Sequence, residues 1–165
     1  MGIRRRKATA DPDKARDPAA VHAAALRHLA RRDFAIGELR SKLISQGYDA
    51  AVVEETLTAL REEGALNDSR FAENYVAYHA RRGQGPVRIG AELRALGLAA
   101  ELVDAALESG PDWRALAREV RSRKFGPEVP DEWAEKGRQA RFLQYRGFSS
   151  DHIRAALGAE FDPDE

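Results

Sequence analysis

The chain has 165 residues and no Cys, and its 27 Lys and Arg balance 27 Asp and Glu to a formal net charge of zero. This length is enough for one compact domain or for an array of small units. The lack of Cys excludes disulfides, thiol catalysis and Cys-ligated metal sites, and no apolar run reaches the roughly 18 residues that a membrane span needs. We therefore expect a cytoplasmic protein. A net charge of zero argues, at first sight, against nucleic acid as a partner.

Composition and patterning predict an all-α protein. Ala, Leu, Arg and Glu dominate, aromatic residues make up 7% of the chain, and no segment alternates apolar and polar residues as a half-buried strand does. The two ends differ from the rest. Residues 1–16 carry six basic and two acidic side chains with almost no large apolar group, so we expect a disordered basic arm there. Residues 159–165 form a short acidic tail.

The first predicted helices follow capping signals. Asp17 can cap a helix that runs to about residue 32. A second helix covers about 36–46 and ends at Gly47, which suits the left-handed residue that often follows a helix. Asp49 then caps a third helix.

The later helices are bounded in similar ways. Asn67-Asp68-Ser69 can cap the next helix, and Gly83-Gln84-Gly85-Pro86 separates it from the helix that follows. Ser149 caps the last helix, and residues 125–130 form a Gly- and Pro-containing connection that is longer than its counterparts.

The chain repeats itself every fifty residues. Similar residues recur in one register three times: Leu43, Gly47 and Leu57; Leu93, Gly97 and Leu107; Leu143, Gly147 and Leu157. The basic pair Arg31-Arg32 recurs at the same offset as Arg81-Arg82. This pattern predicts three tandem three-helix repeats, over residues 17–64, 65–110 and 111–158, that stack into an elongated, curved array.

No constellation of residues points to catalysis. The four histidines (His22, His28, His79 and His152) have no metal-ligand spacing, and the chain has no nucleophile elbow, Walker loop or dinucleotide fingerprint. The repeat register makes His152 a half-buried core position. We expect a non-enzymatic protein without metal or cofactor.

The Gly turn between the second and third helices of each repeat suggests a helix-turn-helix, whose second helix must enter the major groove of DNA. However, residues 49–64 hold five acidic side chains and one basic, and residues 98–110 hold three acidic and none basic. Phosphates would repel such helices. We therefore reject operator binding by the first two repeats.

The first and second helices of each repeat are basic instead. Residues 21–46, 70–96 and 113–147 have net charges of +3, +3 and +4, so the zero total is a cancellation between basic and acidic helices. Regular stacking would place a basic stripe beside an acidic one. Two interpretations stay open: the stripe binds a partner, or opposite charges pair between neighbouring helices and the arginine pairs only favour helix C-termini.

Four segments, in this order along the chain, carry a family resemblance: residues 31–43 (RRDFAIGELRxKL), 66–76 (LNDxRFAxxYV), 83–97 (GxGPxRIxxELxxLG) and 142–149 (FLxxRGFS). Together they make the sequence resemble the RecX family of recombinase regulators, over about residues 17–158. The resemblance implies three tandem three-helix repeats, which agrees with the period above.

The resemblance also implies a function. RecX proteins bind the filament of the RecA recombinase on single-stranded DNA, and inhibit strand exchange and ATP hydrolysis by blocking filament growth or promoting disassembly. The resemblance accordingly implies a role in recombination and DNA repair, with the RecA filament as partner and single-stranded DNA contacted directly or through RecA. Because the array can complete its own core, we expect a monomer.

The basic residues that we expect to contact RecA or DNA are the paired Arg31, Arg32, Arg81 and Arg82, then Arg40, Lys42, Arg88 and Arg94 on second helices, and Arg123, Lys124, Arg138, Arg141 and Arg146 in the third repeat. The motif residues Leu39, Leu43, Phe71, Tyr75 and Leu93 are expected in the core. Two alternatives stay open: a general nucleic-acid-binding module that acts without RecA, and an adaptor that docks another protein through its acidic third helices.

Overall fold

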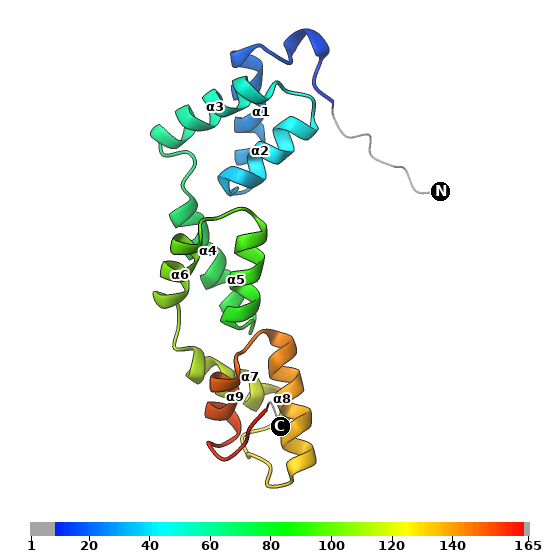
Figure 1. Cartoon of the computed structure of the whole chain (residues 1–165), viewed down its shortest axis with the longest axis vertical. Coiled ribbons are helices and arrows are strands. Elements are labelled where there is room, and N and C mark those ends of the chain that lie inside the picture. The colour runs from blue at the N-terminus through cyan, green and yellow to red at the C-terminus, as the bar shows by residue number, and fades with distance from the viewer. Residues whose placement is uncertain (1–8, 164–165) are drawn as a thin grey trace, which may run out of the picture. The chain divides into compact units, whose positions relative to one another are not determined.

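The computed structural model describes residues 9–163, and over this range every regular element is helical. After the short 3-10 helix η1 (Pro12–Lys14), the α-helices are α1 (Pro18–Leu29), α2 (Ile36–Ser45), α3 (Ala50–Glu62), α4 (Asp68–Arg81), α5 (Pro86–Ala95), α6 (Ala100–Glu108), α7 (Trp113–Phe125), α8 (Trp133–Arg146) and α9 (Ser150–Leu157) (Figure 1). The all-α prediction is confirmed for this part of the chain. None of these helices is both long and apolar enough to cross a membrane.

The described residues divide into two compact units. The first holds residues 9–71 together with Leu96–Leu98, and the second holds Ala72–Ala95 with residues 99–163. The division falls inside α4, whose first residues belong to the first unit.

In the first unit, α1, α2 and α3 pack on one another around an aliphatic core. Leu39 and Leu43 lie four residues apart on one face of α2 and are fully buried, as their spacing predicts. Val21 of α1 and Val53 and Leu60 of α3 complete the same core. The three helices of this unit are therefore held together mainly by burial of apolar surface.

The capping signals of this unit are confirmed. The Asp17 carboxylate accepts a hydrogen bond from the Ala19 N–H (3.0 Å), and Asp49 accepts from Ala51 (3.1 Å) and Val52 (3.3 Å). Gly47 has a φ of 98°, in the left-handed region. The first helix, however, ends at Leu29 and not near residue 32, because the chain turns there to bury Phe34.

Residues 9–16 differ from the predicted disordered arm, while residues 1–8 lie outside the described residues. Asp11 caps η1, and two backbone hydrogen bonds tie the segment to the loop after α2: Ala10 N–H to the Gln46 carbonyl (2.6 Å) and Asp49 N–H to the Ala15 carbonyl (2.9 Å). The segment is short of apolar side chains, but its backbone finds partners in that loop.

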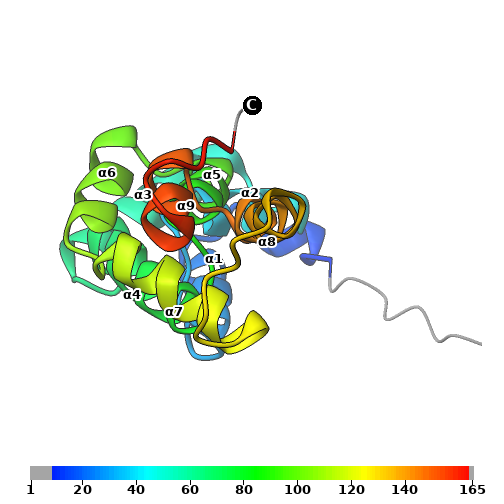
Figure 2. The same cartoon turned by 90° about the horizontal axis from the view of Figure 1, so that it is seen from below.

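In the second unit, α5 packs on α6, and α7, α8 and α9 pack on one another (Figure 1 and Figure 2). Leu93, Leu143 and Ile153 are fully buried. Tyr75 corrects the expected core list, because it is only half-buried and its hydroxyl donates to Glu92 Oε2 (2.7 Å). Ser149 caps α9 as predicted, and half-buried His152 completes the capping box.

A backbone junction in the second unit joins the start of α5 to the end of α8. The Gly85 N–H donates to the Arg146 carbonyl (2.8 Å), and the Val87 N–H donates to the Gly147 carbonyl (3.0 Å). The first unit has a similar close approach, where a Cβ on Gly37 would lie 3.2 Å from the Leu96 carbonyl oxygen.

The predicted acidic tail is packed as far as the structure describes it. Phe161 is buried against the core of α7, α8 and α9, with its ring 4.9 Å from that of Trp133. Glu160 forms an ion pair with Lys136 (3.0 Å). This segment therefore belongs to the fold, apart from residues 164 and 165, which lie outside the described range.

Candidate functional site

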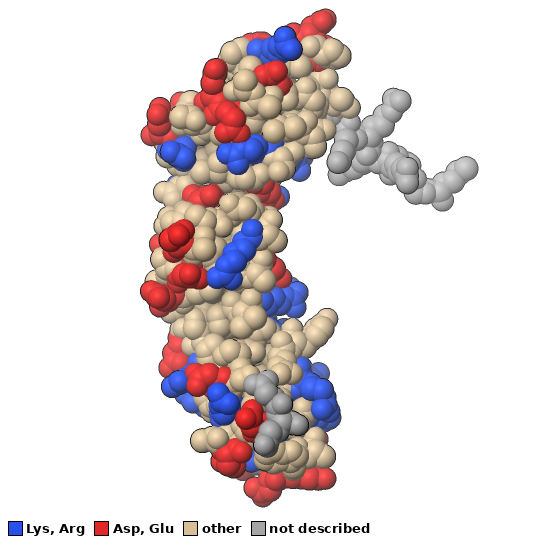
Figure 3. Space-filling view, in the orientation of Figure 1, with Lys and Arg blue, Asp and Glu red and all other residues tan. Residues whose placement is uncertain are grey.

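The structure separates the thirteen predicted contact residues into paired and unpaired cations. Six of them form ion pairs: Arg32–Glu38 (2.5 Å), Arg40–Glu54, Arg88–Glu92 (2.9 Å), Arg94–Asp104 (2.8 Å), Arg123–Glu119 and Arg138–Glu135 (2.7 Å). On the face drawn in Figure 3, basic and acidic side chains adjoin one another in both compact units. For these six cations, pairing with carboxylates of the same chain accounts for the basic and acidic side chains that occur close together in the sequence pattern.

Two of these pairs join a basic second helix to an acidic third helix. Arg40 of α2 contacts Glu54 of α3, and Arg94 of α5 contacts Asp104 of α6. The hydrogen bond from Arg40 lowers the pKa of the Glu54 carboxyl. Glu54 and Asp104 are fifty residues apart, so the repeat places a carboxylate at the same position in both acidic helices.

Seven cations have no carboxylate partner within residues 9–163: Arg31, Lys42, Arg81, Arg82, Lys124, Arg141 and Arg146. Arg31 and Arg141 are exposed to solvent and form no side-chain hydrogen bond or ion pair in that range, and the Arg81 side chain donates only to the Ala77 carbonyl of its own helix (3.2 Å). The two arginine pairs therefore differ, since Arg32 is neutralised by Glu38 and Arg82 has no such partner.

Three unpaired cations converge in the second unit. Arg82, Lys124 and Arg146 line a groove of about 200 Å³, together with Gly83, Val120, Arg123 and Phe142. We call this the basic groove, defined by Arg82, Lys124, Phe142 and Arg146. The only carboxylate bonded to a lining residue in the described chain is Glu119, which holds Arg123.

Phe142 organises the cations of the basic groove. Lys124 Nζ lies 5.9 Å from the centroid of its ring, and the Arg146 guanidinium carbon lies 5.3 Å from it. The Phe125 ring is nearly perpendicular to the Phe142 ring, with the two ring centroids 5.3 Å apart. Because cations and another ring surround it, Phe142 acts as a platform for positive charge and not as an open stacking surface.

The sequence positions of the groove cations explain why they gather here. Arg82 directly follows α4, Lys124 lies in the last turn of α7, and Arg146 is the last residue of α8. The C-terminal end of a helix favours positive charge. Arg146 also donates to the carbonyl of Arg82 (3.4 Å), and Arg82 donates to the Tyr78 hydroxyl (3.2 Å).

The basic groove is suited to an anion. Guanidinium and ammonium groups that lack carboxylate partners can bind phosphate or carboxylate oxygens through charge-assisted hydrogen bonds. Within residues 9–163, no group of three or more His, Asp or Glu is arranged to hold a metal ion.

A nearby aromatic residue was not among the predicted site residues. Tyr145, next to Arg146 on α8, has 81% of its surface exposed. The two earlier repeats have Ser45 and Ala95 at the equivalent positions. The replacement of small residues by an aromatic one, beside an unpaired Arg, is the sequence signal that could have identified it.

Comparisons with known proteins agree with the fold. The family models of the first, second and third three-helix domains of RecX match residues 22–60, 67–107 and 112–157 of this chain, respectively. A crystal structure of RecX from Lactobacillus salivarius superposes with a TM-score of 0.76 at 21% identity, covering 87% of this chain and 96% of that one. At that identity the likeness shows the fold alone.

Relatives with higher identity extend the agreement to sequence. The chain is 50% identical over 147 residues to the regulatory protein RecX of Halorhodospira halophila, covering 88% of this chain and 91% of that protein. It is 44% identical over 142 residues to the regulatory protein RecX of Ectopseudomonas mendocina, covering 86% and 95%. With its three three-helix domains matched in order and these relatives aligned over most of their length, the chain belongs to the RecX family of regulatory proteins.

Proposed function

We propose that the protein is a non-enzymatic regulator of the RecA recombinase that binds the RecA filament on single-stranded DNA. Binding lowers ATP hydrolysis and strand exchange, because the bound protein blocks extension of the filament or promotes its disassembly. The family membership supports a regulatory role, and the basic groove is the observation that carries the binding mode.

The basic groove suits this partner because a nucleoprotein filament presents phosphates and acidic side chains. Three cations without carboxylate partners in the described chain can contact several phosphate oxygens at once. The thirteen predicted residues are not equivalent in this proposal. Arg82, Lys124 and Arg146 are the principal contacts, with Arg31, Lys42, Arg81 and Arg141 as further unpaired cations.

The alternative of a nucleic-acid-binding module that acts without RecA is favoured by the same groove. It predicts direct binding to single-stranded DNA that weakens steeply as the salt concentration rises. The adaptor alternative is weakened, because Glu54 and Asp104 on the acidic third helices are engaged by Arg40 and Arg94 of the same chain.

The test is a titration of RecA ATPase activity on single-stranded DNA with the wild-type protein and with the triple variant Arg82→Gln, Lys124→Gln, Arg146→Gln. A matched variant, Arg27→Gln, Arg61→Gln, Arg118→Gln, removes the same charge from exposed positions that do not line the groove. We expect wild type and the matched variant to inhibit alike. The groove variant should require about a hundredfold more protein, since three phosphate contacts are lost and each costs on the order of 1 kcal/mol.

Each outcome has a separate meaning. No inhibition by equimolar wild-type protein would overturn the proposed function. Equal inhibition by wild type and the groove variant would remove the basic groove from it. Binding to an oligodeoxythymidine without RecA, measured at several salt concentrations, distinguishes the alternative module.

A further inference from the structure

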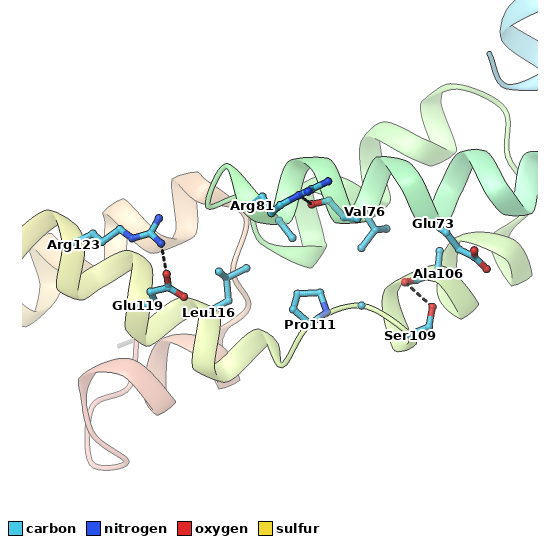
Figure 4. A pocket seen from close by; sticks show the side chains of 12 residues that line it. Glu73, Val76, Arg81, Ala106, Ser109, Pro111, Leu116, Glu119 and Arg123 are labelled. Carbon is cyan, nitrogen blue, oxygen red and sulfur yellow. Dashed lines mark hydrogen bonds and ion pairs between the residues drawn. The ribbon is translucent and has the colours of Figure 1, made fainter. Parts of the chain in front are cut away.

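A second, larger groove lies in the second compact unit, between α4 and α7 (Figure 4). Its volume is about 700 Å³, within the range of sites that hold a ligand or a short peptide segment. Val76 and Ala80 of α4 form one wall, Ala106 of α6 and Pro111 form the floor near α6, and Leu116 of α7 stands opposite. We call this the apolar groove.

The α4 wall has a regular pattern. Glu73, Val76, Ala77, Ala80 and Arg81 recur at the spacing of one helix face, and all line the groove. Val76 and Ala80 are buried, while Ala77 is exposed. Because the central side chains are small, the space between α4 and α7 is left open and not filled by the chain itself.

Two unpaired charges of opposite sign bracket this wall. Glu73 and Arg81 are eight residues apart, which is about 12 Å along a helix. Within residues 9–163, Glu73 has no ion-pair partner, and the Arg81 side chain donates a hydrogen bond only to the Ala77 carbonyl. On the opposite wall, by contrast, Glu119 and Arg123 neutralise each other (Figure 4).

These charges decide which kind of partner fits. The four charged residues that line the groove are two carboxylates and two cations, so the groove has no net attraction for a polyanion such as DNA. A protein helix can supply apolar side chains for the centre, a cation to meet Glu73, and a carboxylate two turns away to meet Arg81. Pairs of this kind at the rim of an apolar contact fix the direction in which the helix binds.

We propose that the apolar groove docks an amphipathic helical segment of the protein partner, about two turns long, with a cation and a carboxylate at the ends of its apolar face. This inference rests on the proposed function in that the partner is the RecA protomer. The basic groove would then contact the anionic part of the filament, and the apolar groove would contact its protein.

The test uses the full chain with one substitution that fills the apolar groove, Ala77→Trp, and a matched substitution, Ala91→Trp, at an exposed alanine of α5 that does not line it. Binding of the labelled protein is measured to RecA assembled on single-stranded DNA, and separately to the same DNA without RecA. We expect Ala77→Trp to bind the filament at least about tenfold more weakly, which is a typical loss for an interface hot spot. Ala91→Trp should bind like wild type, and both variants should keep the affinity of wild type for DNA alone.

A second pair of variants tests the charges. The single change Arg81→Glu should weaken filament binding, and Glu73→Arg with Arg81→Glu, which keeps the net charge, should weaken it at least as much because both ends of the groove are reversed. Filament binding by Ala77→Trp equal to that of wild type would overturn the inference alone. Absence of filament binding by the wild type would overturn the proposed function as well. If Ala77→Trp lost its affinity for DNA alone, the occupant of the apolar groove would be nucleic acid. If the wild type formed a dimer that Ala77→Trp dissociates, the occupant would be a second copy of the chain. Either result would overturn the inference.

Discussion

Gly85 and Gly147 meet backbone to backbone, although 62 residues separate them in the sequence. A Cβ built on Gly85 would lie 2.4 Å from the carbonyl carbon of Gly147, a distance that no side chain can adopt. Gly147 also has a φ of 95° and would place its own Cβ 2.3 Å from that of Arg88. Both glycines are therefore required by close packing, and Gly147 by its left-handed backbone as well.

The first prediction concerns this junction. Gly85→Ala should lower the free energy of unfolding by about 2 kcal/mol or more, because the backbones must separate and two hydrogen bonds must lengthen. The measurement is urea denaturation followed by circular dichroism.

Gly137→Ala is the control for that prediction. Gly137 lies inside α8, and a Cβ there would meet only the Arg141 side chain, at 3.7 Å. The same chemical change should therefore stabilise the protein by about 0.5–1 kcal/mol. Destabilisation of equal size by the two alanines would contradict the role that we give to the junction.

The second prediction concerns Tyr145. If nucleic acid passes the basic groove, the exposed ring next to Arg146 can stack on a base, and such stacking contributes about 1–3 kcal/mol per base. Tyr145→Ala should weaken binding to oligodeoxythymidine by about tenfold, and Tyr145→Trp should retain it. Fluorescence anisotropy provides the measurement. Equal loss in the Ala and Trp variants would mean that stacking is not the cause.

The third prediction is a dependence of stability on pH. Burial lowers the pKa of the His152 imidazole, although Asp151 opposes the shift. Neutral Nδ1 lies 2.9 Å from Ser149 Oγ and accepts from the Ser149 N–H (3.3 Å), which closes the capping box of α9.

A proton on Nδ1 would remove these acceptor contacts. The unfolded chain binds that proton more readily, so the stabilising contribution is present above the ordinary histidine pKa of about 6.5 and is lost as the pH falls below it. Thermal melts should show a larger loss between pH 7.5 and pH 5.5 in wild type than in His152→Gln, which keeps a capping side chain without titrating. The same loss in both proteins would assign the effect to other groups.

Local signals in the sequence predicted much of the fold. Capping by Asp17, Asp49 and Ser149 depends on residues within three positions, so it could be read directly from the chain. The cap of α2 could not be predicted, because the Ile36 N–H donates to Asp68, which is 32 residues away (2.8 Å). Within the predicted cap cluster 67–69, Asn67 is the residue whose side chain caps α4, by accepting from the Arg70 N–H (3.0 Å).

The candidate site was less predictable for the same physical reason. A surface cation is free or paired according to which carboxylate the fold brings near it, as with Arg40 and Glu54, fourteen residues apart. The long connection after α7 shows the same dependence. Arg121 is 3% exposed and donates to the carbonyls of Pro127 and Glu128 (both 3.0 Å), so this arginine organises the loop and is not a surface cation.

The basic groove lies where α4, α7 and α8 end. Because of this location, ligand binding is coupled to the stability of the second unit. The last carbonyls of a helix have no partners within it, so these ends are the parts that open most readily. An anion bound by Arg82, Lys124 and Arg146 together would connect the ends of these three helices. By thermodynamic linkage, such a ligand would raise the melting temperature of the unit, and opening of the helix ends would weaken ligand binding in proportion to the population of the open form.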